Sequence, residues 1–326
     1  MVVLNVLLLL AGFVALVKGA DWFVDGAAGM AKRLKVPELI IGLTIVALGT
    51  SMPELAVSSF AALQKSSEIA LSNVTGSNIF NILCVLGVCA LLHPVSVDRD
   101  VIRRDFPLSI GVTVFVLLVA GVTALSGGSL KDAGMQGIVG KIARPVGAAL
   151  LAGIACYVFV LVRKAKKHPT PEAAESEVAP AKKLALLLLV GLALIIAGGE
   201  AVVAGAKAVA RAAGMTETLI GLTIVAVGTS LPELVTSIVA AKKGQTDLAL
   251  GNALGSNLFN MMLILGVSAL IRPTSVNLAS LIDLAILLGI SIVAFAFSLT
   301  SKKITRSKGA VLISLYVADV VFAVLR

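Results

Sequence analysis

Uncharged apolar runs of about 20 residues recur along the whole chain, and they restrict its fold more than any other feature. A helix of about 20 residues crosses the roughly 30 Å hydrocarbon layer of a bilayer, so each run is long enough to span one. The composition agrees, because 58% of the 326 residues are hydrophobic, 14% are charged and the mean hydropathy is +1.04. Soluble domains have about a quarter charged residues. These values exclude a soluble, disordered or fibrous protein and predict a polytopic helical membrane protein.

Charged breaks between the apolar runs divide the chain into ten expected helices. They lie near residues 2–31, 37–63, 68–92, 105–125, 146–162, 184–210, 216–241, 247–271, 279–299 and 308–325. We therefore expect an all-α polytopic membrane protein with ten transmembrane helices. No positive charge precedes the first apolar stretch, so we interpret it as a retained span and not as a signal peptide.

The polar stretch 164–183 contains three prolines and mixed charges, which predicts a flexible linker. It separates a first five-helix half, residues 1–163, from a second half, residues 184–326. If the amino terminus lies outside, most of the 27 Lys and Arg residues fall in inner connections. Because cytoplasmic loops concentrate Lys and Arg, we predict a cell (inner or plasma) membrane protein with both termini outside and a cytoplasmic linker.

The net charge of +9 has the same explanation, so we expect the lipid bilayer as partner and no nucleic acid. The sequence indicates no obligate protein partner either. The three cysteines, Cys84, Cys89 and Cys156, lie inside apolar runs without CxxC spacing. We interpret them as small hydrophobic residues that bind no metal and form no disulfide.

An internal duplication is the strongest signal within the spans. GLTIVALGTSMPELAVS at 42–58 matches GLTIVAVGTSLPELVTS at 221–237, and NVTGSNIFN at 73–81 matches NALGSNLFN at 252–260. Both matches keep one offset without a gap, which defines repeat 1 (41–88) and repeat 2 (220–267). Five spans separate equivalent points, so the two copies cross the membrane in opposite directions. Inverted repeats of this kind are typical of secondary transporters that bind their substrate near mid-membrane, where the halves meet.

Each repeat places one glutamate deep in an apolar span, Glu54 in the first and Glu233 in the second. An acidic residue at the bilayer centre costs about 2.5–3.5 kcal/mol on insertion scales, and neither motif contains a Lys or Arg that neutralises it. A carboxylic acid that only joins two helices by hydrogen bonds is the alternative reading. We expect both glutamates to face the interior and to bind a cation or a proton.

Neutral oxygens surround both glutamates. Pro53 and Pro232 each remove a helical hydrogen bond, which loosens the turns that contain Ala47 and Ala226 and frees backbone carbonyls. Hydroxyls and amides complete the motifs, namely Thr50, Ser51, Thr229, Ser230, Asn73, Ser77, Asn81, Asn252, Ser256 and Asn260. A proline kink and helix packing through Gly76 and Gly255 explain part of this pattern, but not the carboxylates. Hard oxygens without His or Cys suit Ca²⁺ and Na⁺, and two carboxylates match one divalent cation.

The duplicated GTSxPE and GSNxFN blocks resemble the α-repeats of the calcium/cation antiporter superfamily, and most of all its prokaryotic sodium/calcium exchangers. The resemblance implies a core of helices 2, 3, 7 and 8, each broken at its motif, and long helices 1 and 6 that slide across it. It implies no cofactor other than the transported ions, Ca²⁺ and Na⁺. It also implies a ligand set, which is Glu54, Glu233, Asn81, Asn260, Thr50, Ser51, Ser77, Thr229, Ser230, Ser256 and the carbonyls of Ala47 and Ala226.

One position departs from the family pattern, because many relatives have Asp where this chain has Asn260. With an amide at this position, the expected site carries two negative charges in place of three. This weakens the case for K⁺ cotransport and leaves open how many Na⁺ ions are exchanged. The GNxxE-type motif of the proton-exchanging branch is absent, which favours Na⁺. We therefore expect an antiporter that exchanges Na⁺ for Ca²⁺ by alternating access and extrudes Ca²⁺. The alternative is a Ca²⁺/H⁺ antiporter in which Glu54 and Glu233 carry protons.

An enzyme is not expected, because no His or Lys base repeats near the motif serines. Two further acidic residues, Asp21 and Glu200, are equivalent by the same offset in helices 1 and 6. They are expected to anchor at the membrane interface or to pair with Lys18 or Lys207, with a role in ion movement as the alternative. Asp25 has no acidic counterpart and is expected to be structural or at the vestibule.

Overall fold

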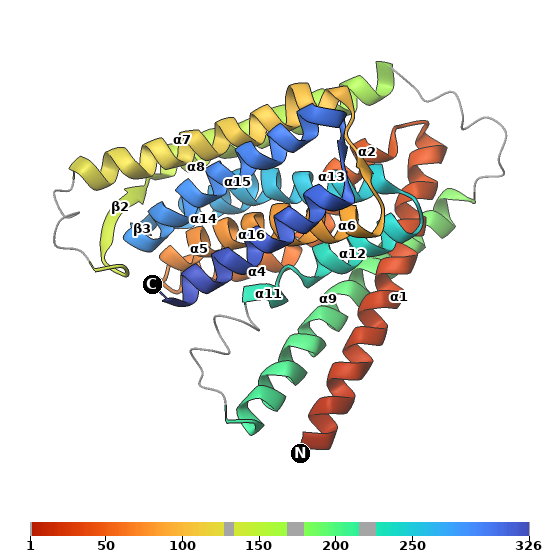
Figure 1. Ribbon diagram of the computed structural model, residues 1–326, viewed down its shortest axis with the longest axis horizontal. Helices are drawn as coiled ribbons and strands as arrows, with labels where there is room; N and C mark the ends of the chain where they lie inside the picture. Colours follow the sequence, from red (N-terminus) through yellow and green to blue (C-terminus); the bar gives the residue numbers. More distant parts are fainter. Residues whose placement is uncertain (1, 127–133, 168–178, 215–225, 326) are drawn as a thin grey trace.

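The structure is a computed structural model that describes residues 2–126, 134–167, 179–214 and 226–325 (Figure 1). Its first half contains α1 (Val2–Leu34), α2 (Glu38–Ile41), η1 (Gly42–Val46), α3 (Ala47–Thr50), α4 (Met52–Leu63), α5 (Glu68–Phe80), η2 (Asn81–Val85), α6 (Leu86–Leu92), β1 (Val95–Ser96), η3 (Val101–Asp105), α7 (Phe106–Ser126), β2 (Ile138–Ile142) and α8 (Arg144–Lys167). Its second half contains α9 (Ala181–Ala212), α11 (Ala226–Gly228), α12 (Leu231–Lys242), α13 (Thr246–Leu258), η6 (Phe259–Ile264), α14 (Leu265–Ile271), β3 (Thr274–Asn277), α15 (Leu278–Ser301), β4 (Lys303–Ile304) and α16 (Arg306–Leu325). The η elements are π-helical turns that continue the neighbouring α-helices.

Within these residues, eight helices are long and apolar enough to cross a bilayer. Glu38–Thr50 and Met52–Leu63, which meet at a bend of 47°, are a ninth candidate if the bent pair counts as one span. The seventh expected helix, 216–241, is described only from residue 226 onward, as α11 and α12. Several helices are longer than expected, and α8 and α9 extend into the predicted linker at both of its ends. The central part of that linker, residues 168–178, lies outside the described residues.

The expected all-helical, multi-span architecture is confirmed, and the loops add two small antiparallel sheets that the sequence did not predict. In one sheet β1 pairs with β4, and in the other β2 pairs with β3, with Ile142 opposite Thr274. Each sheet joins a loop of the first half to a loop of the second half. Buried backbone N–H and C=O groups need partners, and pairing these β-branched segments supplies them where the helices end.

The motif helices form the centre of the bundle. The spans α5–η2–α6 and α13–η6–α14 are buried along most of their length, whereas the other long helices keep most of their residues at the surface. The expectation that all four core helices are broken at their motifs is wrong for these two. They stay continuous and contain a π-helical turn at the motif instead, beginning at Asn81 and Phe259. Such turns shift the backbone hydrogen bonds by one residue and are frequent at functional sites.

Glycines bring the backbones of the two repeats into contact. A Cβ added to Gly251 would lie 2.7 Å from the carbonyl oxygen of Leu39, and one added to Gly255 would lie 2.8 Å from the Cα of Leu43. The close approach expected at Gly255 is therefore confirmed. For Gly76, no atom of the described residues lies within 4 Å of an added Cβ, so the close approach expected there is not seen in this part of the chain.

We expect Gly255→Ala to destabilise the protein, because its Cβ would meet Ala47 and Leu43 on the facing helix. Backbone atoms cannot move aside like the end of a flexible side chain, and overpacking of this kind costs about 1–3 kcal/mol. The melting temperature in detergent should fall, and differential scanning fluorimetry measures it. Gly111→Ala in α7 is the control, because no atom lies within 4 Å of its added Cβ. Equal melting temperatures for the two variants would contradict the close packing.

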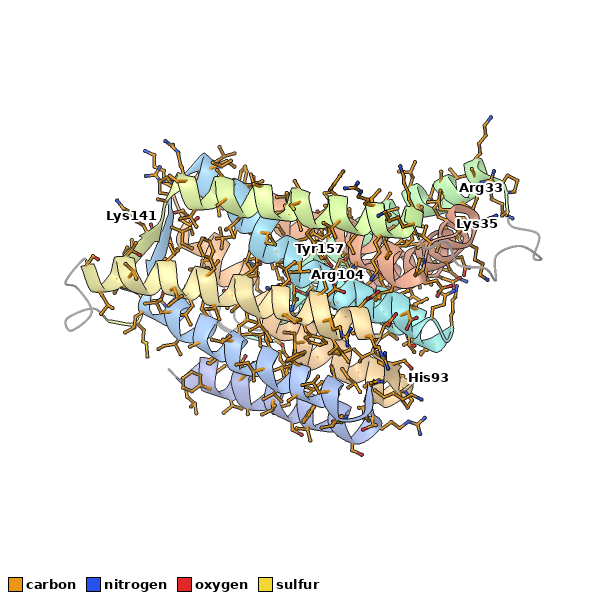
Figure 2. All side chains as sticks on the ribbon, turned by 90° about the horizontal axis from the view of Figure 1, so that it is seen from above. Arg33, Lys35, His93, Arg104, Lys141 and Tyr157 are labelled. Carbon is orange, nitrogen blue, oxygen red and sulfur yellow. The ribbon has the colours of Figure 1, made fainter. Side chains whose placement is uncertain are left out.

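The helices α1 and α9 run side by side and project beyond the rest of the bundle (Figure 1). Glycines face this contact at seven-residue intervals, Gly12 and Gly19 on α1 and Gly191 and Gly198 on α9. A Cβ on Gly198 would lie 2.6 Å from the backbone nitrogen of Leu16, so the two backbones touch. The predicted inner loops lie at one end of the molecule, with Arg33, Lys35 and His93, and the predicted outer residue Lys141 lies at the other (Figure 2).

Candidate ion-binding site

Both GTSxPE motifs lie where one helical segment ends and another begins. Ser51 precedes α4 and Ser230 precedes α12, and each helix has its motif proline in the first turn. Proline is favoured there, because its missing N–H has no partner within the helix in any case. Each glutamate consequently lies in the first turn of a helix. The positive end of the helix dipole then offsets part of the cost of burying a carboxylate.

The two motifs are linked across the repeats by their serines. The Ser51 hydroxyl donates to Oε1 of Glu233 at 3.0 Å, and the Ser230 hydroxyl donates to Oε1 of Glu54 at 3.1 Å. Neither serine hydroxyl caps its own helix. Both glutamates are fully buried. Among the described residues, no Lys or Arg forms an ion pair with either of them.

The GSNxFN helices add a layer of hydroxyls and amides. The Ser77 hydroxyl lies 3.0 Å from the Ser230 hydroxyl and 3.4 Å from Oε1 of Glu54. Thr50 of the first repeat donates to Oδ1 of Asn252 in the second at 3.0 Å and lies 3.4 Å from the Ser256 hydroxyl. Apart from the Ser77–Glu54 contact, which lies within the first repeat, these contacts connect the first block of one repeat with the second block of the other.

Four buried oxygens of this layer have no hydrogen-bond partner among the described residues. They are Oε2 of Glu54, Oε2 of Glu233, Oδ1 of Asn81 and Oδ1 of Asn260. Buried polar atoms are nearly always paired, so four unpaired acceptors of equivalent origin indicate that something else binds them. When the carboxylates are ionised, all four oxygens can act only as hydrogen-bond acceptors or as ligands of a cation.

The described part of the chain contains no group of three or more His, Cys, Asp or Glu residues that could hold a metal ion. The candidate site therefore combines two carboxylates with neutral oxygens. This is the donor set of Ca²⁺ and Na⁺, which bind carboxylate, carbonyl and hydroxyl oxygens.

The structure joins nine of the predicted ligand residues through these contacts and the amide contacts described below. They are Thr50, Ser51, Glu54, Ser77, Asn81, Ser230, Glu233, Ser256 and Asn260. The Ala47 carbonyl lies in α3, directly before the break, and accepts from the backbone N–H of Ser51 at 3.1 Å. Ala226 is the first described residue after the gap at 215–225. Thr229 is half-buried at a cavity wall.

A cavity of about 570 Å³ reaches both motif prolines from the side of α9. Its walls include Pro53, Pro232 and Thr229 next to the motifs, together with Glu200 and Lys207 on α9. The lining is mainly apolar, but it includes the charged side chains of Glu200, Lys207 and Arg211 and reaches the prolines next to the buried glutamates. Glu200 and Lys207 lie on the wall of the same space, and a role of Glu200 in ion movement stays a prediction.

The sequence interpretation missed three sets of contacts. Ser58 and Ser237 accept from Asn73 and Asn252 at 3.0 and 2.9 Å, and their duplication at the same offset could have revealed them. The expected partners of Asp21 were wrong, because Lys243 pairs with Asp21 at 2.7 Å and with Asp25 at 2.6 Å.

The third set is a buried charged cluster at the start of α7. Arg104 and the Tyr157 hydroxyl both bind the carboxylate of Asp105, at 2.7 and 2.9 Å. Asp105 is fully buried and Tyr157 nearly so. None of these residues belongs to the repeated blocks, so the duplication carries no signal for them.

Comparisons with known proteins identify relatives over the whole length. The family model described as sodium/calcium exchanger protein matches residues 4–163 and 183–325. Sodium/calcium exchanger MaX1 of Methanosarcina acetivorans is 35% identical, covering 98% of this chain and 99% of the relative. Inner membrane protein YrbG of Escherichia coli is 36% identical, covering 88% and 86%. A structure of the sodium-calcium exchanger NCX_Mj soaked with Na⁺ and Ca²⁺ is similar at a TM-score of 0.82, with 30% identity and full coverage of both chains.

Proposed function

The chain belongs to the sodium/calcium exchanger protein family, and from this premise we propose that it exchanges Na⁺ for Ca²⁺ across the membrane by alternating access. It is a multi-pass membrane transporter and not an enzyme. In the proposed direction, inward movement of Na⁺ drives Ca²⁺ out of the cell.

The observation that carries this proposal is the set of four unpaired buried oxygens. One carboxylate oxygen and one amide oxygen come from each inverted repeat, at Glu54, Asn81, Glu233 and Asn260. Two carboxylates neutralise one Ca²⁺, or two Na⁺, so both ions suit the same site in turn. The serine and threonine hydroxyls around the carboxylates supply further oxygens of the kind that both ions accept.

Alternating access requires the site to open to each side in turn. The inverted repeat supports this, because the core presents equivalent segments to the two membrane faces. The α1–α9 pair lies across that core, with small residues at its own contact. We propose that this pair moves over the core and that the cavity beside α9 is one path to the site.

We propose the cell membrane as the location, with the linker on the cytoplasmic side. Arg33 and Lys35, in a predicted inner loop, lie at the opposite end of the molecule from Lys141, in a predicted outer loop, which is consistent with the proposed topology (Figure 2). The relative YrbG is named an inner membrane protein, which is consistent with this location.

The test is ⁴⁵Ca²⁺ uptake into proteoliposomes that contain the purified protein. One set of vesicles is loaded with Na⁺ and diluted into Na⁺-free buffer, and a second set carries a pH gradient and no Na⁺. Na⁺-loaded vesicles should accumulate Ca²⁺, and collapsing the Na⁺ gradient with an ionophore should stop the uptake. Vesicles without protein control for leakage.

Uptake with the pH gradient alone would overturn the Na⁺ assignment. It would favour the Ca²⁺/H⁺ antiporter in which Glu54 and Glu233 carry protons. Absence of Ca²⁺ uptake under both gradients, with Na⁺ flux still present, would show that another cation is the substrate.

A further inference from the structure

Four asparagines form a closed pattern of hydrogen bonds where α5–η2 crosses α13–η6. The Asn78 side-chain amide donates to the backbone carbonyl of Asn257 at 3.2 Å, and the Asn257 amide donates to the carbonyl of Asn78 at 3.3 Å. Asn81 donates to Oδ1 of Asn257 at 3.1 Å, and Asn260 donates to Oδ1 of Asn78 at 3.0 Å. All four side chains are buried.

Chemistry fixes which way each amide points. A backbone carbonyl only accepts hydrogen bonds, so the Asn257 group that faces the carbonyl of Asn78 must be the NH₂ group. Its oxygen then faces Asn81, which must present its own NH₂ group in return. The oxygen of Asn81 is thereby turned away from Asn257, and it is one of the four unpaired acceptors.

The same reasoning applies to Asn78 and Asn260, with one difference. The Asn260 amide also donates to the Ser77 hydroxyl at 3.1 Å, so it has two acceptors. Among the hydrogen bonds of the described residues, Asn81 donates to Asn257 alone. Asn257 therefore determines the orientation of Asn81 more completely than Asn78 determines that of Asn260.

We propose that Asn257 and Asn78 are positioning residues, each of which holds the ligand amide of the opposite repeat with its oxygen toward the transported ions. This inference rests on the proposed function, in which Asn81 and Asn260 bind those ions. An amide without such an anchor has two orientations of similar shape. In one of them the NH₂ group faces the cation and repels it.

The test compares Asn257→Ala in two backgrounds, the parent and Asn81→Asp. In the parent background the released amide of Asn81 can rotate, and the KM for Ca²⁺ should rise about tenfold, because losing one oxygen ligand of the cation is comparable with losing one hydrogen bond to a charged group. A carboxylate presents an oxygen in either rotation. In the Asn81→Asp background, at about pH 8.5, Asn257→Ala should therefore change the KM less than about twofold.

A lower KM for Ca²⁺ in the double variant than in Asn81→Asp alone also supports the proposal. In Asn81→Asp alone, a carboxylate oxygen faces Oδ1 of Asn257, and two acceptors repel each other. Removing Asn257 relieves this contact. The matched comparison tests Asn78→Ala in the parent and in the Asn260→Asp background. In the parent background, Asn78→Ala should raise the KM less than Asn257→Ala does, because the Ser77 hydroxyl still accepts from Asn260.

Proteoliposome ⁴⁵Ca²⁺ uptake gives KM and maximal rate for each variant after elution as a single peak in detergent. An equal loss from Asn257→Ala in both backgrounds would assign Asn257 a packing role and overturn the proposal. Asn81→Ala separates this failure from that of the site itself, because transport at the parent KM in that variant would show that Asn81 is not a ligand. If Asn257→Ala alone fails to fold while the double variant with Asn81→Asp folds, that rescue supports the proposal, since the fold then tolerates loss of the Asn257 amide.

Discussion

Replacing Glu54 or Glu233 with glutamine is expected to lower Na⁺-driven Ca²⁺ exchange at least a hundredfold while the protein stays folded. Both carboxylates are fully buried and accept from a serine of the opposite repeat, and both keep a second oxygen without a partner. Each variant leaves one charge to balance a divalent cation. Unit charges about 4 Å apart interact by about 4 kcal/mol at an effective dielectric constant of about 20, which is nearly a thousandfold in affinity.

Stability should hold or rise in these variants, because an empty site no longer buries that carboxylate. Uptake of ⁴⁵Ca²⁺ measures the exchange, and differential scanning fluorimetry with and without Ca²⁺ measures folding and binding. The parent should gain thermal stability with Ca²⁺, and the variants should not. Glu68→Gln is the control, because this glutamate begins α5 outside the network and should transport like the parent. Normal transport by Glu54→Gln and Glu233→Gln would exclude both residues from the site.

Most of the site could be predicted from the sequence, because the duplication marks the residues that face each other. Glu54 and Glu233, or Ser51 and Ser230, are polar positions that an apolar span does not need for packing. Their repetition at one offset indicates a shared function, and inversion of the repeats indicates that they meet. The structure brings these four residues together as two reciprocal hydrogen bonds.

The orientation of the amides could not be predicted in the same way. Helical spacing places Asn78 beside Ser77 and Asn81, but it does not show that its NH₂ group reaches a carbonyl on another helix. The continuity of α5–η2–α6 was also missed, because a π-helical turn has no clear sequence signature and resembles a break in periodicity.

Residues outside the duplication were the hardest to place. The pairing of Lys243 with Asp21 and Asp25 depends on how α1 crosses the end of α12, and no local pattern sets that crossing. The Asp105 cluster likewise depends on where η3 lies relative to Tyr157 on α8. Charged residues that are not duplicated have no equivalent position in the other repeat, so their partners follow only from the tertiary structure.

Asn260→Asp is expected to make Ca²⁺ transport strongly dependent on pH. The substitution replaces the NH₂ group that donates to Oδ1 of Asn78 with an oxygen, so two acceptors face each other. A proton on the introduced carboxylate restores the donor. It also avoids three neighbouring carboxylates in one empty, buried site, which do not all stay ionised. Ca²⁺ then competes with this proton, and uptake should fall on acidification at a pH about one unit or more above that of the parent.

Asn81→Asp should behave similarly, since Asn81 makes the equivalent contact with Oδ1 of Asn257. The experiment measures Na⁺-driven ⁴⁵Ca²⁺ uptake from about pH 5.5 to 8.5 for the parent and both variants. The two aspartate variants should approach parent rates only at the alkaline end, where the added carboxylate ionises and contributes a third charge. Ser72→Asp is a suitable control, because Ser72 lies on the same helix as Asn81 and bonds to Ser280 on α15 instead of the site. If both variants transport at the parent rate with the parent pH profile, Asn81 and Asn260 do not face the ions.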